Sequence, residues 1–263
     1  MKFFLSIFIL LFSISLSQEN QPYPPIDLIS IPTSGTLPKG TYLIETLLTN
    51  NGGVLPKFLI GISENFTLGF SFGVQNFIGT GDVVKNKAYP EFNLKYRVYE
   101  ESERFPAVLI GFNTQGKGKY DEINERYDQK AMGLYLVASR NWNALGNLGF
   151  HIGINKNAME GQDKDINLFF GFDKEINRSF SLLAEYNFAR NDDELKDTSG
   201  IDLREGRGIF NLGVRWSATD NLMLEFNFND TFKNIKYLDE EDEESIPFKS
   251  RVREVKIIYF EQF

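Results

Sequence analysis

Residues that could act as nucleophiles, bases or metal ligands are scarce in this sequence. The 263 residues include no Cys and one His, His151. Without Cys there is no thiol catalysis, no disulfide and no Cys-based zinc site. A single His disfavours a Ser-His-Asp enzyme, because His is the base of that chemistry. We therefore predict no catalytic, metal or cofactor-binding residues, and no cofactor.

The surroundings of His151 argue against an outer-membrane enzyme. Phe150 and Ile152 flank it in an alternating segment, so its imidazole falls on the opposite, polar face. Gly153 and Asn155 follow it on that face, and no Ser does. Outer-membrane phospholipases need a His and a Ser on the lipid side of one strand, and omptin-type proteases need paired acids with a His-Asp pair. The nucleophile–base pair is missing from this strand, and we predict a non-enzymatic protein.

Two glycine-containing loops and one acidic run are further candidates for ligand binding. Gly79-Thr80-Gly81 and Gly116-Lys117-Gly118 resemble phosphate-loop fragments, but they lack a strand–loop–helix context and are interpreted as loop turns. Asp239–Glu244 is a run of six carboxylates in a long loop. It is either a solvated tip or a bridge to lipopolysaccharide through divalent cations, because carboxylate oxygens suit Ca²⁺.

Charge and composition exclude several classes of protein. The 28 basic and 36 acidic residues give a net charge of -8, which argues against nucleic acid as a partner. The 25 Phe and 11 Tyr exclude a disordered chain. After the first residues, no stretch approaches the roughly 18 apolar residues that a membrane-spanning helix needs.

The chain begins with a targeting segment and an arm. Residues 1–17 combine Lys2 with the apolar run Phe3–Ile14 and predict a cleaved signal peptide, because the run is too short for an anchoring helix. Residues 18–39 contain five prolines and predict an extended periplasmic arm. Its apolar residues between Ile26 and Ile31 are expected to dock at the periplasmic mouth of the domain that follows.

From residue 40 to the end, the pattern is that of β-strands. In 91–98, apolar and polar residues alternate strictly, which indicates a strand with one apolar and one very polar face. About twelve such segments follow one another. They are 41–49, 56–63, 66–75, 90–98, 106–113, 132–141, 147–155, 165–174, 179–188, 207–217, 221–229 and 251–260. No amphipathic helix is evident, the one candidate being Glu122–Lys130 inside a loop.

The connections alternate between short turns and long polar loops. This alternation predicts an all-β fold, a transmembrane antiparallel up-and-down β-barrel over residues 40–263. Its short turns are expected in the periplasm and its long loops outside the cell, with both chain ends periplasmic. The alternative is a soluble β-sandwich, whose strands also alternate.

The two strand faces predict the surroundings of each side chain. The apolar face would meet lipid, and the polar face would line the lumen. Acids and bases are interleaved on the polar face, which favours either a network that fills a narrow lumen or a hydrated lining. The predicted lipid-facing aromatic residues are Phe70, Phe72, Phe92, Tyr96, Phe112, Phe150, Phe170, Phe172, Tyr186, Phe188, Phe210, Trp216, Phe226 and Phe228. The predicted lumen-lining residues with ionisable side chains are Glu45, Glu91, Lys95, Arg97, His151, Asp173, Glu185, Arg215, Glu225, Glu254 and Lys256.

The C-terminal segment resembles the assembly signal of outer-membrane barrels. Val255, Ile257, Tyr259 and the terminal Phe263 fall on one face, as that signal requires, whereas Glu261 departs from it. The resemblance implies the outer membrane of a Gram-negative-type bacterium. It also implies that the barrel-assembly machinery recognises this strand, and that outer-membrane lipids and lipopolysaccharide surround the barrel.

Two stretches resemble a known family. Phe105–Phe112, reading FPAVLIGF, and Tyr135–Arg140, reading YLVASR, flank a glycine-containing loop. This is similar to the YjbH-like outer-membrane β-barrel proteins of exopolysaccharide biosynthesis, and Ile31–Gly40 fits as well. The resemblance implies a non-enzymatic barrel that assists export or assembly of a surface exopolysaccharide, with polysaccharide as a further partner. It supplies no catalytic residues. The alternatives are a general diffusion pore and a structural envelope barrel.

Overall fold

The computed structural model describes most of the chain. The described residues are 25–49, 52–79, 81–122, 124–192, 208–237, 248–249 and 252–263. The predicted signal peptide, the first part of the arm and the acidic run 239–244 lie outside the described residues.

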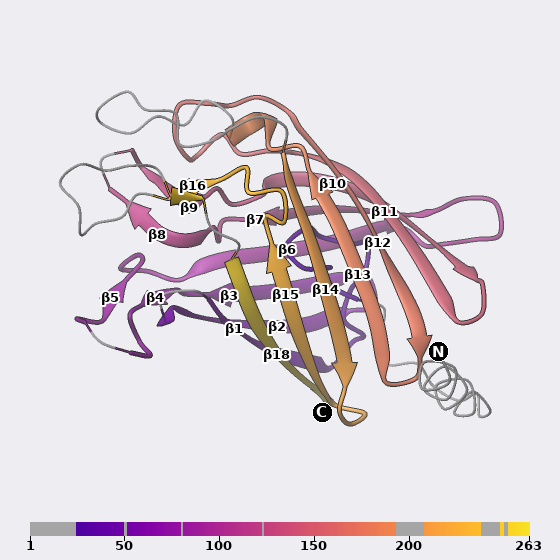
Figure 1. The fold of residues 1–263 in the computed structure, drawn as a ribbon. Coiled ribbons are helices and arrows are strands. Elements are labelled where there is room, and N and C mark those ends of the chain that lie inside the picture. Colours follow the sequence, from indigo (N-terminus) through magenta and orange to yellow (C-terminus); the bar gives the residue numbers. More distant parts are fainter. Residues whose placement is uncertain are drawn as a thin grey trace, which may run out of the picture.

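Twelve long antiparallel strands form a closed barrel (Figure 1). Each strand pairs with its neighbour in sequence, and the first pairs with both the second and the last, which closes the sheet. The all-β up-and-down prediction is therefore confirmed, and each predicted segment overlaps one of these strands. The strands are β1 (Thr41–Leu48), β2 (Val54–Ser63), β3 (Phe66–Ser71), β6 (Glu91–Tyr99), β7 (Ala107–Asn113), β10 (Gly133–Asn143), β11 (Asn147–Lys156), β12 (Asn167–Asn177), β13 (Phe180–Asn187), β14 (Ile209–Ser217), β15 (Leu222–Asn229) and β18 (Val252–Gln262).

The long connections carry short elements of their own. The segment 122–130, the candidate helix, instead contains a strand that pairs with the segment before it to form a hairpin, with Tyr120 opposite Tyr127. No helix in the described part of the chain is long and apolar enough to cross a membrane. The short elements are β4 (Val74–Gln75), β5 (Val84–Lys85), β8 (Lys117–Asp121), β9 (Arg126–Gln129), the 3₁₀ helix η2 (Arg190–Asp192), β16 (Lys236–Tyr237) and β17 (Phe248–Lys249).

The barrel exterior is apolar because the alternating strands turn one face outward. Phe92 is 56% exposed and Phe170 is 44% exposed, and Phe170 packs against Tyr186 with ring centroids 5.7 Å apart. The predicted lipid-facing residues all lie on this outer face. An apolar band rich in aromatic residues is the surface that a transmembrane barrel presents to lipid.

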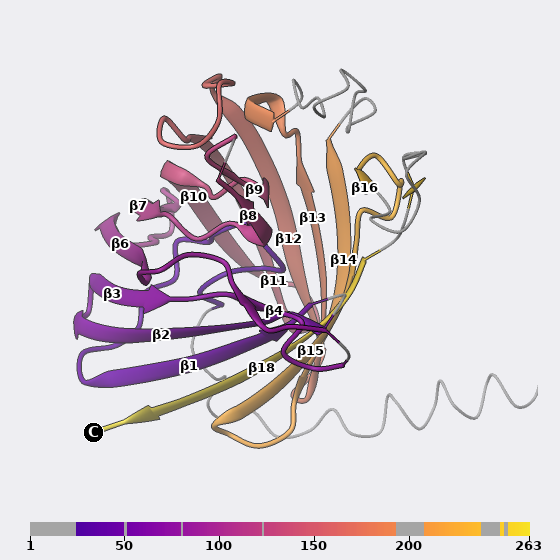
Figure 2. The same ribbon diagram turned by 90° about the vertical axis from the view of Figure 1, so that its left-hand side faces the viewer.

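The buried core lies inside the barrel and not between packed sheets. One apolar cluster joins Leu28 and Ile31 of the arm to inward residues of the strands, among them Val137 and Phe169. A second joins Ile26 and Leu37 of the arm to Leu43, Leu59, Ile258 and Phe260. The arm thus contributes to both clusters, and Figure 2 shows this indigo segment lying inside the barrel.

Candidate functional site: a lumen closed from both ends

The arm folds back on itself inside the lumen. Asp27 and Pro32 form an isolated β-bridge, and the backbone N–H of Leu28 donates to the carbonyl of Ile31 at 3.0 Å. The tip between them is almost fully buried. The arm joins β1 at the short-turn end of the barrel, where the backbone N–H of Gly40 donates to the carbonyl of Gly61 at 2.9 Å. It therefore goes deeper than the expected docking at the periplasmic mouth, because the wall supplies charged partners for its backbone.

Glu185 of β13 holds the tip of the arm. Its carboxylate accepts the backbone N–H groups of Ile29 at 3.0 Å, Ser30 at 3.0 Å and Ile31 at 3.1 Å, and it also accepts the Ser30 hydroxyl. Asn211 donates to the same carboxylate at 2.7 Å. Successive N–H groups that converge on one anion form a strong charge-assisted site.

Cations of the wall satisfy the carbonyl groups of the arm. Lys256 donates to the carbonyls of Leu28 at 3.2 Å and Ile29 at 3.0 Å. Arg215 donates to the carbonyl of Asp27 at 3.0 Å, and Lys95 donates to that of Ile26. Buried backbone groups without a partner are costly, so these side chains replace the strand ladder that the tip of the arm lacks.

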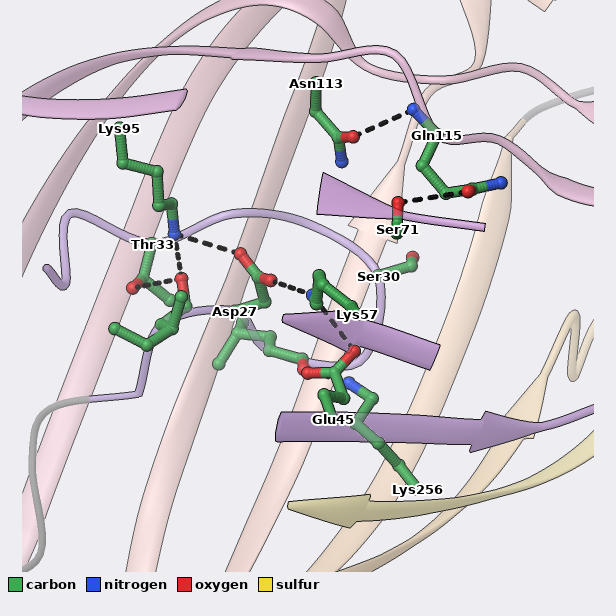
Figure 3. Close-up of polar contacts among 12 residues, drawn as sticks. Asp27, Ser30, Thr33, Glu45, Lys57, Ser71, Lys95, Asn113, Gln115 and Lys256 are labelled. Carbon is green, nitrogen blue, oxygen red and sulfur yellow. Dashed lines mark hydrogen bonds and ion pairs between the residues drawn. The ribbon is translucent and has the colours of Figure 1, made fainter. Parts of the chain in front are cut away.

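Asp27 is the charged centre of the arm. Its carboxylate forms ion pairs with Lys57 at 2.9 Å and with Lys95 at 3.0 Å, and Lys57 also binds Glu45 at 3.0 Å. Figure 3 shows Asp27 between the two lysines, with Glu45 below Lys57. Lys95 is 0% exposed, so Asp27 neutralises a cation that has no access to water. Buried charges are tolerated when they are paired in this way.

The remaining wall charges pair between neighbouring strands or at the barrel ends. Glu225 binds Arg215 at 2.7 Å and Lys256 at 3.1 Å, and it lies directly opposite both in the sheet. Arg97 lies at the short-turn end and donates to the carbonyl of Glu64 at 3.0 Å. The acids and bases that are interleaved on the polar face in the sequence therefore neutralise one another locally in the structure.

His151 has a Ser partner, contrary to the sequence analysis. Its Nδ1 lies 2.7 Å from Ser139 Oγ and its Nε2 lies 2.8 Å from Asp173 Oδ1. Ser139 lies on β10, directly opposite His151 of β11. The sequence analysis considered only residues on the same strand as His151 and therefore did not find it. Ser139 Oγ also accepts the backbone N–H of Ser34 at 2.9 Å. This buried Asp-His-Ser chain has the composition of a catalytic triad, but here it links the wall to the arm, which covers the hydroxyl.

The β8–β9 hairpin closes the long-loop end, and the sequence analysis did not predict it. Tyr127 is 1% exposed, and its hydroxyl donates to Glu91 at 3.0 Å. Arg126 pairs with Asp192 at 2.6 Å. Lys117 pairs with Glu254 of β18 at 2.8 Å, and it begins β8, so the segment 116–118 interpreted as a loop turn leads into a strand. The hairpin is thus fixed to strands and loops on several sides of the barrel.

The titratable groups around the hairpin are perturbed by burial. Burial raises the pKa of the Glu160 carboxyl, although the backbone N–H groups of Tyr127 and Ala131 partly oppose it. Burial also lowers the pKa of Lys130, which donates to the carbonyl of Asn191 at 2.8 Å. Burial opposes the charge of Lys87, but the hydrogen bond and charge of Glu91 outweigh it and raise the pKa of Lys87.

A cavity of about 80 Å³, lined by both polar and apolar residues, lies between the arm and the hairpin. This volume holds several water molecules. Within the described ranges, no group of three or more acidic or His side chains is placed to hold a metal ion. The polar residues that line the cavity are Asp27, Ser30, Glu45, Lys57, Asn93, Asn113, Gln115, Lys117, Gln129, Lys130, Asn187 and Lys256.

Comparison with known proteins gives structural similarity at low identity. No family model matches the chain, and no curated protein matches it. Among solved structures, the NanC porin is similar at 9% identity and a TM-score of 0.45, covering 84% of this chain and 99% of that one. A loop-deletion mutant of OmpT, an outer membrane protein of Vibrio cholerae, is similar at 7% identity and 0.33, covering 84% and 97%. The outer membrane channel DcaP of Acinetobacter baumannii is similar at 7% identity and 0.32, covering 84% and 95%.

Proposed function

We propose that this protein is a non-enzymatic diffusion pore of the outer membrane, closed by its own N-terminal arm. The observation that carries this proposal is that the lumen is filled by a separate segment. Ion pairs of the wall include Arg215–Glu225, which joins neighbouring strands, Lys57–Asp27, which joins the wall to the arm, and Lys117–Glu254, which joins it to the hairpin. A lumen that needs an inserted chain to fill it is wide enough to conduct when that chain leaves.

The way the arm is held favours a removable plug over a permanent filling. The tip of the arm shares no ladder with the barrel and is held by Glu185, Lys256, Arg215 and Lys95. Water and ions can replace these polar contacts one by one when the arm withdraws toward the short-turn end. The exposed wall would then present these charged side chains, which an aqueous pore requires, together with apolar residues such as Val137 and Phe169 that now pack against the arm.

An outer-membrane location is part of this proposal. It is supported by the apolar outer band and by the predicted signal peptide and C-terminal assembly signal. In that setting, lipids and lipopolysaccharide surround the band, and the barrel-assembly machinery inserts the chain through the strand that ends at Phe263.

The exopolysaccharide role that the YjbH-like resemblance implies stays a prediction. A cavity of about 80 Å³ between the two closures holds several water molecules, which is far less than a sugar chain occupies. Export through this lumen would require both the arm and the hairpin to move. A diffusion pore also requires the arm to withdraw, but the hairpin need shift only far enough to pass a small solute. This smaller rearrangement makes the diffusion pore the function that the geometry supports best.

Single-channel recording in planar bilayers tests the pore. We expect the intact protein to conduct poorly and the Glu185→Ala variant to open often, because the tip of the arm loses its carboxylate. Glu261→Ala is the matched control, since Glu261 accepts the Tyr42 and Tyr259 hydroxyls at an exposed site away from the arm. A large steady conductance from the intact protein would overturn the plug. A silent Glu185→Ala protein, together with a silent protein lacking residues 18–36, would favour the structural envelope barrel.

A further inference from the structure

The cavity between the arm and the hairpin is lined by charges of both signs, most of which are paired. Lys57 is paired with Asp27 and Glu45 at 2.9 and 3.0 Å, and Lys117 is paired with Glu254 at 2.8 Å. A pore that selects ions concentrates one sign of charge along its path. The lining of this cavity instead mixes acids with lysines, and it presents no ring of one sign to an entering ion. Lys130 is the exception to the pairing, because within the described residues it donates to the carbonyl of Asn191 at 2.8 Å and to no carboxylate.

The amide groups of the same wall still have hydrogen-bonding capacity. Asn93 is 3% exposed, and its Oδ1 has no hydrogen-bond partner. Asn113 lies directly opposite Asn93 on the neighbouring strand. Asn113 uses its Oδ1 to accept the backbone N–H of Gln115 at 2.9 Å, which leaves its amide nitrogen as a donor (Figure 3). An amide acceptor and an amide donor therefore stand side by side at the cavity.

The remaining amides extend this pattern around the cavity. Asn187 accepts hydrogen bonds from Asn167 at 2.7 Å and from the backbone of Ala189 at 3.0 Å through its Oδ1, and it also has an amide nitrogen to offer. Gln129 of β9 contributes a fourth amide from the hairpin side. A hydroxyl group needs one acceptor for its proton and one donor for its oxygen, which paired amides supply.

We infer that this cavity is a binding site for small uncharged solutes rich in hydroxyl groups, such as polyols, on the permeation path. The inference rests on the proposed pore and names its substrate class. A polyol satisfies Asn93 and Asn113 together. It leaves the pairs Lys57–Glu45 and Lys117–Glu254 undisturbed, and these pairs do not depend on the arm. A bare ion gains little from either group. The site selects by hydrogen bonding and pore width, with charge contributing little.

The test measures the uptake of labelled solutes into liposomes that contain the Glu185→Ala protein. The probes are xylitol, the xylonate anion and the triethanolammonium cation. We expect xylitol uptake to be the fastest. Asn93→Ala should slow it about fivefold, the equivalent of one hydrogen bond of about 1 kcal/mol, and leave the ions unchanged. Asn113→Ala is the second variant. It should also slow xylitol uptake and leave the uptake of the two ions unchanged.

Two further variants control for indirect effects. Asn227→Ala is matched to Asn93→Ala, because Asn227 is also buried with an unpartnered Oδ1 but does not line the cavity. It should leave xylitol uptake unchanged. Glu254→Gln leaves Lys117 without its counter-charge and should raise xylonate uptake. Ion uptake equal to or faster than xylitol uptake would overturn the solute class and leave the pore standing. A protein that passes none of the three solutes would refute the pore itself.

Discussion

The arm and the β8–β9 hairpin close the same lumen by different physical means. The tip of the arm lacks a ladder with the barrel, and its N–H and C=O groups are bound by charged side chains of the wall. The hairpin has its own two-stranded ladder and is attached by side-chain contacts such as Arg126–Asp192 and Tyr127–Glu91. A closure held through its backbone depends on the charges of the wall. A closure with internal pairing can move as a unit.

Burial separates the two closures further. Leu28, Ile29 and Ile31 at the tip of the arm have 0–2% of their surface exposed. In the hairpin, Arg126 and Tyr127 of β9 are buried, whereas all residues of β8 are partly or largely exposed. The arm therefore contributes to the apolar core as well as to the closure. We expect changes to the arm to affect stability and conductance together, and changes to the hairpin to affect conductance alone.

The largest effect is expected for Asp27→Ala. This change leaves Lys95 buried without its counter-charge, and breaking such a pair costs about 3–5 kcal/mol. The arm should withdraw, so that protease added to opened membranes cleaves it much faster than in the unmodified protein. An arm equally protected in both proteins would show that Asp27 does not hold it.

A smaller effect is expected for Arg126→Ala. It removes the 2.6 Å pair with Asp192 and should loosen the hairpin without releasing the arm. A spin label at position 119, attached through Lys119→Cys, should become more mobile, while the protease resistance of the arm stays unchanged. Loss of arm protection in this variant would mean that the two closures are coupled.

The smallest effect concerns pH at the hairpin. Burial raises the pKa of Glu160 above its ordinary value of 4.5, so the docked hairpin favours the protonated carboxyl. The stabilisation by this group is greatest below pH 4.5 and is lost as the pH rises through the raised pKa. The spin label at position 119 should therefore be less mobile at acidic pH. Glu160→Gln should remove this dependence, and an identical pH profile in that variant would assign it to another group.

The barrel could be predicted from the sequence because its signal is local. Alternation within segments such as 91–98 marks each strand, and the lengths of the connections mark the two ends. The lipid-facing aromatic residues followed from the same alternation. Nothing in this reasoning requires knowledge of which strands face one another across the lumen.

The site could not be predicted because its contacts are not local. Glu185 binds Ile29 across 156 residues of sequence, and Ser139 meets His151 only through the register of β10 and β11. The hairpin was missed because its short polar strands have little apolar periodicity. Its stability comes instead from buried contacts such as that of Tyr127 with Glu91.

The most direct test of the closed lumen is a disulfide between Ser34→Cys and Ser139→Cys. The chain has no native Cys to compete, and the backbone nitrogen of Ser34 lies 2.9 Å from Ser139 Oγ, so the two residues are in direct contact. In the Glu185→Ala background, oxidation should form this bond, as mass spectrometry will detect, and should silence the channel, which a reductant then reopens. Thiols that do not cross-link in the folded protein and react freely with a bulky maleimide would contradict an arm inside the lumen.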